Sequence, residues 1–315
     1  MNSSAAARKI TCGSRDGFIM VAALWLLAGL AALAAVASLY IAQSAAALSA
    51  LDAATQWEML STAGVELAAY ELSAPVTVRR PTHGGVGFRL ANSSVKVEYM
   101  SEAARLNLNM APRAMIAGLF AALGAPAEAA DQYAGRVIAW RSAPRPNDQD
   151  EEQGLYRAAG LNYLPRRGPF NSADELWLVL GLPAALVERA LPFVTVYSGM
   201  AEINVLDAAP EVIAALPGMT PAKLDAFLNR REELPSDDPE FVIGALGGRQ
   251  PGATVSGSEA YRVRMRITLP DGRQRAPEAV IQILGPAEKQ AFRVLAWNDD
   301  INPDRGGRPR PTASR

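Results

Sequence analysis

Residues 18–42 read FIMVAALWLLAGLAALAAVASLYIA, directly after Asp16-Gly17, and contain neither a charged residue nor a proline. A helix rises 1.5 Å per residue, so about 20 apolar residues cross a hydrocarbon core that is about 30 Å thick. This stretch is longer than that. It therefore predicts a membrane-spanning helix that continues beyond the bilayer, and this helix determines how the rest of the chain is organised.

The residues before the apolar stretch indicate how it is oriented and processed. Arg8, Lys9 and Arg15 give the N-terminal segment a positive charge, which predicts a cytoplasmic N-terminus and an exported body. A secretory signal has a shorter apolar region, about 7–15 residues, with its cleavage site after it. Here the candidate cleavage point, between Gly17 and Phe18, comes before the apolar stretch. A plain signal anchor remains the alternative.

Composition restricts the class of protein only weakly. The chain has 315 residues, 20% of them charged, and a formal net charge of −1, which gives no reason to expect nucleic acid or anionic lipid as the main partner. The single cysteine, Cys12, lies in the leader, so a processed chain would contain no disulfide.

The pattern along the chain predicts an α+β fold. One helix is expected from about Phe18 to about Leu72, followed by a β segment over 86–100, in which Val95, Val97 and Tyr99 alternate with charged residues. A block of helices follows. They are expected at 114–123, 128–141, 172–180 (opened by a Ser172/Glu175 capping box), 183–191, 209–216 and 221–231.

The C-terminal part reads as three antiparallel strands, over 261–269, 279–284 and 292–297, with a hairpin turn at Asp271-Gly272. A helical block between β segments that share a sheet reads as an insertion with its two ends close together. The residues from 298 onwards are rich in Pro, Gly and charge and are expected to be disordered. No internal repeat is obvious, although the segments that begin at Leu106-Asn107 and at Ile203-Asn204 have similar sequences.

A Leu216-Pro217-Gly218 turn between two short helices looks like a helix-hairpin-helix unit, whose backbone amides can meet a phosphate. DNA binding is therefore an alternative function. The charge around the turn opposes it, because residues 211–240 contain three basic and seven acidic side chains, and phosphate contacts dominate nucleic-acid affinity.

An acidic run and a single histidine are the residues that could carry chemistry. Asp148, Asp150, Glu151 and Glu152 follow two prolines in an expected loop, where close carboxylates could hold Ca²⁺ or simply be solvated. His83 is the only histidine and lies in a Gly/Pro-rich stretch without the partners of a catalytic triad. An enzyme that uses paired carboxylates stays open as an alternative, but no pair is singled out.

Taken together, five segments resemble the K-type minor pseudopilins of the bacterial type II secretion system. They are Gly17-Phe18 with the apolar helix, LNLN (106–109), FNSADEL (170–176), VTVYS (194–198), and INV (203–205) followed by LPG (216–218). The resemblance covers nearly the whole chain. It implies a pilin-like long N-terminal helix packed on an antiparallel sheet, with a large all-α insert of SAM-like, helix-hairpin-helix type.

The resemblance also implies roles for individual residues. A prepilin peptidase would cut after Gly17 and leave Phe18 as an N-methylated first residue. Most pilins carry Glu at the fifth mature position, where this chain has Ala22, as K-type members do. Members also resemble one another in an acidic, calcium-binding loop. Here Trp140-Arg141-Ser142-Ala143 stand where acids are expected, which puts calcium at Asp148, Asp150, Glu151 and Glu152 in doubt.

The resemblance thus implies a non-enzymatic minor pseudopilin of the inner membrane, with its body in the periplasm, that initiates and caps the tip of a pseudopilus. Its partners would be I- and J-type minor pseudopilins. The subunits would dock through their stem helices, where small residues such as Ala31 and Ala34 allow close approach. Nucleic acid is not expected as a partner. A minor pilin of a type IV pilus is a close alternative. The expected parts are a leader (1–17), a stem helix (18–74), a β body (75–109 and 257–297), a helical insert (110–256) and a tail (298–315).

Overall fold

The computed structural model describes residues 16–73, 80–144, 150–285 and 287–299, and it divides into two compact units, 1–59 and 60–315. A single helix, α1 (Asp16–Ser73), runs through the first unit into the second. Its sequence contains no proline and is rich in alanine and leucine, which are strong helix formers. The predicted long helix is therefore confirmed to within two residues at each end.

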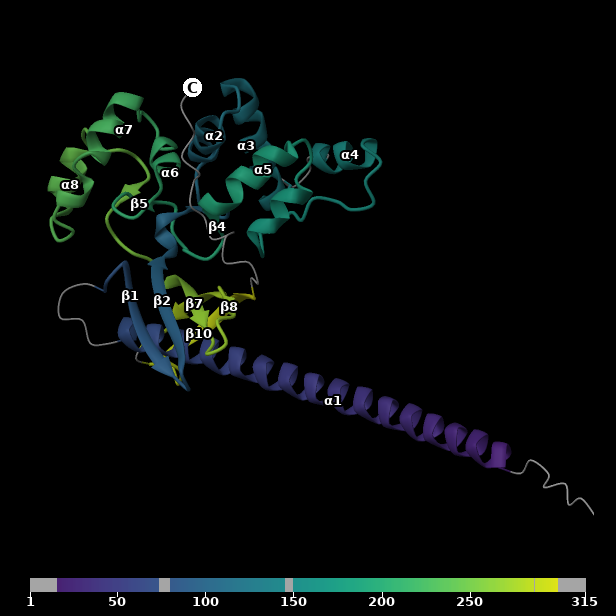
Figure 1. The fold of residues 1–315 in the computed structure, drawn as a ribbon. Helices are drawn as coiled ribbons and strands as arrows, with labels where there is room; N and C mark the ends of the chain where they lie inside the picture. The colour runs from purple at the N-terminus through teal and green to yellow at the C-terminus, as the bar shows by residue number, and fades with distance from the viewer. Residues whose placement is uncertain (1–15, 74–79, 145–149, 286, 300–315) are drawn as a thin grey trace, which may run out of the picture. The chain divides into compact units, whose positions relative to one another are not determined.

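The second unit contains one antiparallel sheet in the order β1-β2-β7-β9-β10, with the short β8 paired to β7 (Figure 1). The strands are β1 (His83–Leu90), β2 (Ser93–Ser101), β7 (Ala260–Thr268), β8 (Gln274–Arg275), β9 (Glu278–Ile283) and β10 (Phe292–Asn298). The strands before and after the insertion thus share a sheet, as expected. Asn298, placed in the tail from sequence, is the last residue of β10; residues 300–315 lie outside the described residues.

The prediction of a single β segment over 86–100 was wrong, because the chain forms a hairpin there. β1 begins at His83 and pairs with β2 along its whole length. The turn is made by Ala91 and Asn92, both with positive φ (49° and 61°). Two such residues match the mirror-image turn that suits the twist of a hairpin, but alanine rarely adopts this conformation.

One face of the sheet packs on the last turns of α1 within the second unit. The buried side chains of this core are Leu60, Val65, Ala68, Ala69 and Leu72 from α1, Val95, Val97 and Tyr99 from β2, Val263, Met265 and Ile267 from β7, and Ala279, Ile281 and Ile283 from β9. Gly64 lets the helix approach β7 closely, since a Cβ there would lie 2.7 Å from the Sδ of Met265. The period-2 pattern of β2 and β7 is thus explained by the helix that covers alternate residues.

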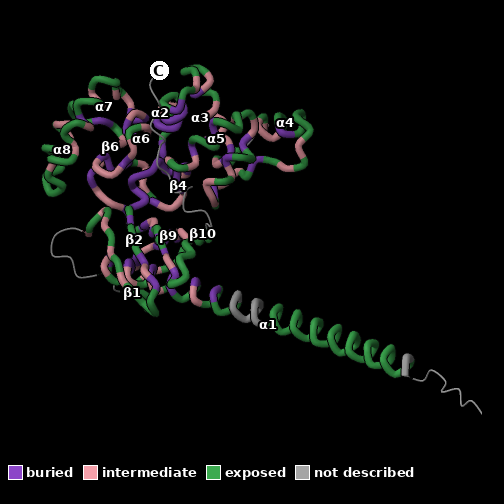
Figure 2. The backbone as a smooth tube through the Cα atoms, viewed as in Figure 1, coloured by how far each residue is buried: buried purple, intermediate pink, exposed green. Residues whose placement is uncertain are grey.

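The insertion between β2 and β7 is a helical body with its own buried core (Figure 2). Its α-helices are α2 (Arg113–Ala122), α3 (Ala127–Arg141), α4 (Glu151–Ala158), α5 (Ala184–Ala190), α6 (Pro210–Ala214), α7 (Pro221–Leu228) and α8 (Pro239–Ala245), and its 3-10 helices are η1 (Glu102–Ala104), η2 (Ala173–Leu178), η3 (Leu191–Phe193) and η4 (Arg231–Glu233). Four two-residue strands pair in parallel, β3 (Leu106–Asn107) with β4 (Val194–Thr195) and β5 (Ile203–Asn204) with β6 (Ala253–Thr254).

One helix prediction needs correction, and two helices were not predicted. The segment expected as a helix over 172–180 is the 3-10 helix η2; Ser172 caps it by accepting from the amide of Asp174, and Glu175 reaches back to the amide of Asn171. Helices α4 and α8 were not predicted, since both are short and begin at aspartate caps, Asp150 and Asp238, rather than at a periodic apolar pattern.

The Leu-Asn and Ile-Asn segments form the same local structure twice. Asn107 accepts from the amide of Asn109 (2.8 Å), and Asn204 accepts in the same way from the amide of Leu206 (3.0 Å). Each asparagine ends a short parallel strand just ahead of a helix, α2 or α6. The two similar sequence segments therefore form a structural repeat within the insert.

The two ends of the insertion meet at one serine pair. The side chain of Ser101, the last residue of β2, accepts from the amide of Ser258 (2.8 Å), and the two hydroxyl oxygens are 3.1 Å apart. Both serines are buried. The predicted closeness of the two ends is thus confirmed, and the insert expected over 110–256 lies within the segment 102–259 that joins β2 to β7.

Beside this junction lies a buried carboxylate that links three segments. The side chain of Glu102, in η1, is fully buried and is bound by Arg105 (3.0 Å) and by Arg262 of β7 (2.8 Å). The hydroxyl of Thr195 in β4 donates to the same carboxylate. Arg262 also pairs with Glu278 of β9, which accepts from Arg264 as well (2.7 Å). The insert and the sheet are therefore joined through one charged network.

The arginines determine the ionisation of this network. Burial by itself raises the pKa of Glu102, but the charges of Arg262 and Arg105 and the hydrogen bonds from Arg262 and Thr195 outweigh it, so the pKa is lowered. Burial, assisted by the charge of Arg262, lowers the pKa of Arg105 to about 10. At neutral pH all of these groups are therefore charged.

We predict that Glu102→Gln destabilises the protein by about 3–5 kcal/mol at neutral pH, because two arginines lose their buried counter-charge. The folded-state pKa of Glu102 is below its unfolded value, so its contribution is complete above about pH 5 and is lost as the pH falls through the folded pKa. The stability difference between wild type and variant, measured by denaturant unfolding, should shrink in acid. The exposed Glu98→Gln serves as the control; equal effects of the two variants would contradict the prediction.

Candidate functional site

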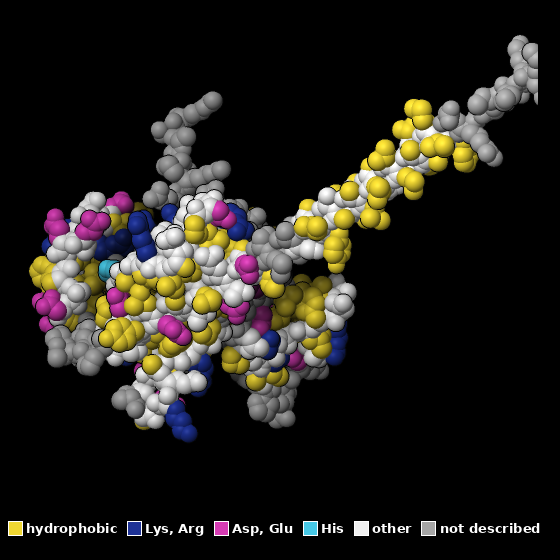
Figure 3. Space-filling view, turned by 60° about the horizontal axis from the view of Figure 1, so that its bottom comes forward, with side chains coloured by type: hydrophobic (Ala, Val, Ile, Leu, Met, Phe, Trp, Pro, Cys, Tyr) yellow, Lys and Arg dark blue, Asp and Glu magenta, His cyan; other side chains and the backbone are white. Residues whose placement is uncertain are grey.

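The N-terminal part of α1 carries the candidate membrane and processing site. Residues 18–44 of α1 are the one helical stretch among the described residues that is long and apolar enough to cross a membrane, and all of them are exposed. Figure 3 shows hydrophobic side chains along the exposed length of this helix. Gly17 and Phe18 lie in its first turn, and Phe18 is exposed. Residues 1–15, including Cys12, lie outside the described residues.

Ala22 lies one turn after Phe18 on the same helix and is exposed like its neighbours. Positions i and i+4 of a helix lie on one face, so a side chain at 22 stands next to the position of the new N-terminus that cleavage after Gly17 would create. Alanine offers no group that could neutralise an amine there.

The acidic segment occupies a helix start rather than the expected loop. Asp150 caps α4 by accepting from the amide of Gln153, and Glu151 and Glu152 are in the first turn. Asp150 also binds Arg167 (2.9 Å), and Glu152 binds Arg136 (2.8 Å), while Glu151 is exposed. Acids at a helix N-terminus are favoured by the helix dipole, which gives this segment a structural explanation.

Two observations concern the predicted calcium site. In the described ranges no group of three or more His, Cys, Asp or Glu side chains is placed to hold a metal ion, and Asp148 lies outside those ranges. One observation points the other way, since the Oε1 atom of Glu152 is buried without a hydrogen-bond partner. A buried oxygen of this kind needs an explanation such as an ion. The calcium site stays a prediction.

The helix-hairpin-helix reading is correct for the backbone of the Leu216–Met219 turn. It joins α6 to α7, and Gly218 has a positive φ (79°) that favours glycine. Gly218 is exposed, its carbonyl accepts from Lys223 (3.4 Å), and a Cβ at Gly218 would lie 3.3 Å from the side chain of Gln250. Both of these contacts of the turn are made within the insert.

His83 makes a contact that the sequence did not indicate. Its Nδ1 atom lies 2.7 Å from Oδ1 of Asp207, although 124 residues separate the two. The side chain of Asp207 is only 2% exposed and also accepts from Asn204 (2.8 Å). This pair joins β1 of the sheet to the segment that precedes α6. The signal is absent from the sequence because nothing local connects the two residues.

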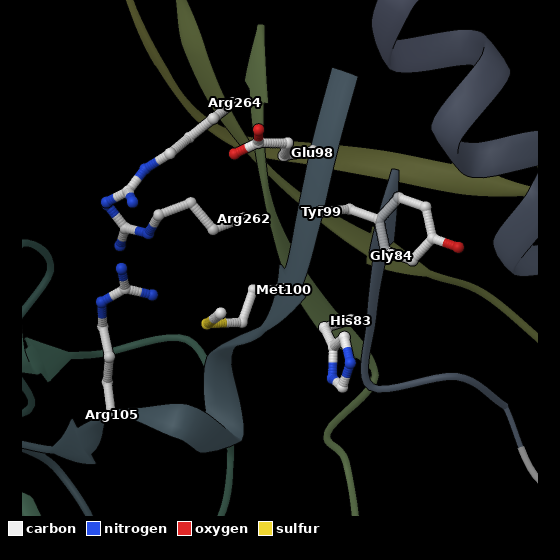
Figure 4. Close-up of a pocket in the computed structure, with 8 residues that line it drawn as sticks. All are labelled: His83, Gly84, Glu98, Tyr99, Met100, Arg105, Arg262 and Arg264. Carbon is white, nitrogen blue, oxygen red and sulfur yellow. The ribbon is translucent and has the colours of Figure 1, made fainter. Parts of the chain in front are cut away.

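A cleft of about 250 Å³ opens beside this pair, at the end of the sheet next to the insert. Its lining residues are His83, Gly84, Glu98, Tyr99, Met100, Arg105, Arg262 and Arg264, among which there is no Ser, Thr or Cys nucleophile (Figure 4). Burial and the charge of Glu71 raise the pKa of Tyr99, so its hydroxyl stays protonated. The His–Asp pair thus lacks a nucleophile in this cleft and acts as a link within the fold.

The comparisons with known proteins agree with one another. Residues 95–199 match a family model described as "Type II secretion system (T2SS), protein K". A solved chain from the GspK-GspI-GspJ complex of the type 2 secretion system of enterotoxigenic Escherichia coli has the same fold, with a TM-score of 0.58 at 17% sequence identity. The match covers 82% of this chain and 99% of that one.

No curated protein matches the sequence. The family match lies on β2 and the first part of the insert, where the LNLN, FNSADEL and VTVYS segments are found. Residues 95–199 of the chain are thus similar to protein K of the type II secretion system, and the chain shares its fold with a chain of the solved GspK-GspI-GspJ complex.

Proposed function

We propose that this protein is the minor pseudopilin that initiates and caps the tip of the type II secretion pseudopilus, without enzymatic activity. The observation that carries the proposal is α1, which joins an exposed apolar span to a pilin-like body and carries Ala22 in place of a carboxylate. The protein is anchored in the inner membrane by residues 18–44, and its body lies in the periplasm. Cleavage after Gly17 and methylation of Phe18 free the helix to pack against other stems.

We predict that the full chain, extracted from membranes of cells that contain prepilin peptidase, begins at Phe18 and lacks Cys12. Intact mass and N-terminal sequencing measure this directly. Gly17→Leu should leave the chain uncut, because a side chain then fills the position before the scissile bond. Gly29→Leu in the same helix, where the added side chain meets open space, is the matched control and should be processed normally. A chain cut after the apolar span would rule out the pilin-like class.

The tip position follows from the electrostatics of a stem in an apolar medium. A charged group at the centre of a bilayer costs several kcal/mol unless it is paired. A subunit with Glu at the fifth mature position can neutralise the amine of the subunit ahead of it. Ala22 cannot, so this protein suits the place that has no subunit ahead. The helical insert adds bulk that fits an end better than the shaft of a filament.

We predict that Ala22→Glu reduces secretion strongly, because its carboxylate at the tip would be buried with no amine from a subunit ahead. Secretion of a cargo protein into the medium is the measurement, with the amount of membrane-inserted protein checked in parallel. Ala22→Leu keeps the position apolar and should secrete normally. Normal secretion by the Glu variant would show that the carboxylate finds a partner and would argue against the tip position.

The partners we propose are the I- and J-type minor pseudopilins. The fold that this chain shares with a K protein solved together with GspI and GspJ supports the proposal. The stems would dock between Phe18 and about Ala50, where Ala31, Ala32, Ala34 and Ala35 let helix backbones approach closely.

We also predict that Ca²⁺ stabilises the protein through the segment 148–152, with the buried oxygen of Glu152 as one ligand. A ligand present at about 100 times its dissociation constant contributes about 2.7 kcal/mol, which corresponds to a rise in Tm of roughly 5–10 °C. Thermal unfolding with Ca²⁺, with Mg²⁺ and with chelator measures this. Glu152→Gln should abolish the shift and the exposed Glu202→Gln should keep it. An unchanged Tm in the wild type would refute the calcium site.

A further inference from the structure

The face of the sheet opposite α1 carries basic side chains from three neighbouring strands. Because strand residues alternate between faces, Val95 and Val97 point to the core and Lys96 points away from it. The pairing of β1, β2 and β7 brings Arg89, Lys96, Arg264 and Arg266 to this side, which we call the outer sheet face. Figure 4 shows this alternation at Glu98 and Arg264, which lie on the opposite side of the strands from Tyr99.

Lys96 and Arg266 stand directly opposite each other in the pairing of β2 with β7. Like charges in this position repel and destabilise a sheet. Among the residues that the structure describes, neither has an ion pair, and Arg89 has none either. Arg264 is only partly engaged, since its Nε atom alone binds Glu278. The fold thus retains an uncompensated repulsion on an exposed surface.

The surroundings of these side chains are open. The cross-strand neighbours of Glu98 and Lys96 on the edge strand β1 are Gly85 and Gly87, so no side chain stands between them and solvent on that side. Lys96 and Arg266 are both exposed. A broad face with cations on separate strands fits the surface of another protein better than it fits a small molecule.

The charge is also unusual for this chain, whose formal net charge is −1. Close to these basic side chains, the outer sheet face carries the acid Glu98, which stands opposite Arg264. Glu278 is already shared by two arginines. We propose that the outer sheet face binds an acidic surface of a partner protein, with Lys96 and Arg266 facing its carboxylates. The inference rests on the geometry of the sheet and is independent of the tip-capping role. Such charge complementarity governs association rate and partner choice and is weakened by salt.

The decisive variant is Lys96→Glu, because it separates binding from stability. It replaces a like-charge pair by an opposite-charge pair with Arg266, so Tm should rise or stay unchanged while affinity falls. Arg249→Glu, an exposed position on the insert with the same change in net charge, is the matched control. The full-length protein in neutral detergent is titrated with an all-glutamate peptide, and an all-glutamine peptide is the reference.

We expect the wild type to bind the glutamate peptide in a salt-sensitive way, Lys96→Glu to bind it about tenfold more weakly, and Arg249→Glu to bind it normally. The double reversal K96E/R266E should bind an all-lysine peptide instead. The proposal is overturned if no variant binds, or if both single variants lose affinity equally. It is also overturned if anionic lipid vesicles, or a second copy of the chain detected by sedimentation, compete for the face and the peptide does not.

Discussion

The arrangement of sheet and insert depends on the charge of one buried carboxylate. Glu102 lies at the point where β2 ends and the insert begins, and Arg262 reaches it from β7, the strand on which the insert ends. Removing the carboxylate from water is costly, and the cost is offset because Arg105, Arg262 and Thr195 all direct hydrogen-bond donors at it. Hydrogen bonds to a carboxylate form only over a limited range of angles. The three donors therefore orient the insert more specifically than apolar packing alone would.

The parts of the fold that could be predicted from sequence are those whose cause is local. The 58-residue helix α1 follows from composition, and β2 and β7 follow from alternation that a covering helix explains. The turn at Asp271-Gly272 followed from its dipeptide. The hairpin of β1 and β2 was missed because its turn uses Ala91 at positive φ, which no residue pattern announces. The 3-10 helix η2 was mistaken for an α-helix because both begin with the same capping residues.

In the candidate site, too, only the relations between residues close in the sequence could be predicted. Gly17, Phe18 and Ala22 lie within one short segment, so their relation is visible in the sequence. The contacts of Glu102 with Thr195 and Arg262 span 93 and 160 residues, and that of His83 with Asp207 spans 124. A single sequence carries no record of such pairs. The acidic run was visible, but its pairing with Arg136 and Arg167 depends on how α3 and the segment after α4 return to it.

The hydrogen bonds between Ser101 and Ser258 have a consequence for the order of folding. β2 and β7 lie side by side, yet these two serines are 157 positions apart in the sequence, and closing so long a flexible loop is entropically unfavourable. The insert has its own core and many local contacts between consecutive helices, so it can form early and bring the two serines together. The central strands of the sheet then meet across a short gap. We therefore expect folding of the insert to set the rate at which the sheet is completed, because non-local pairings limit folding.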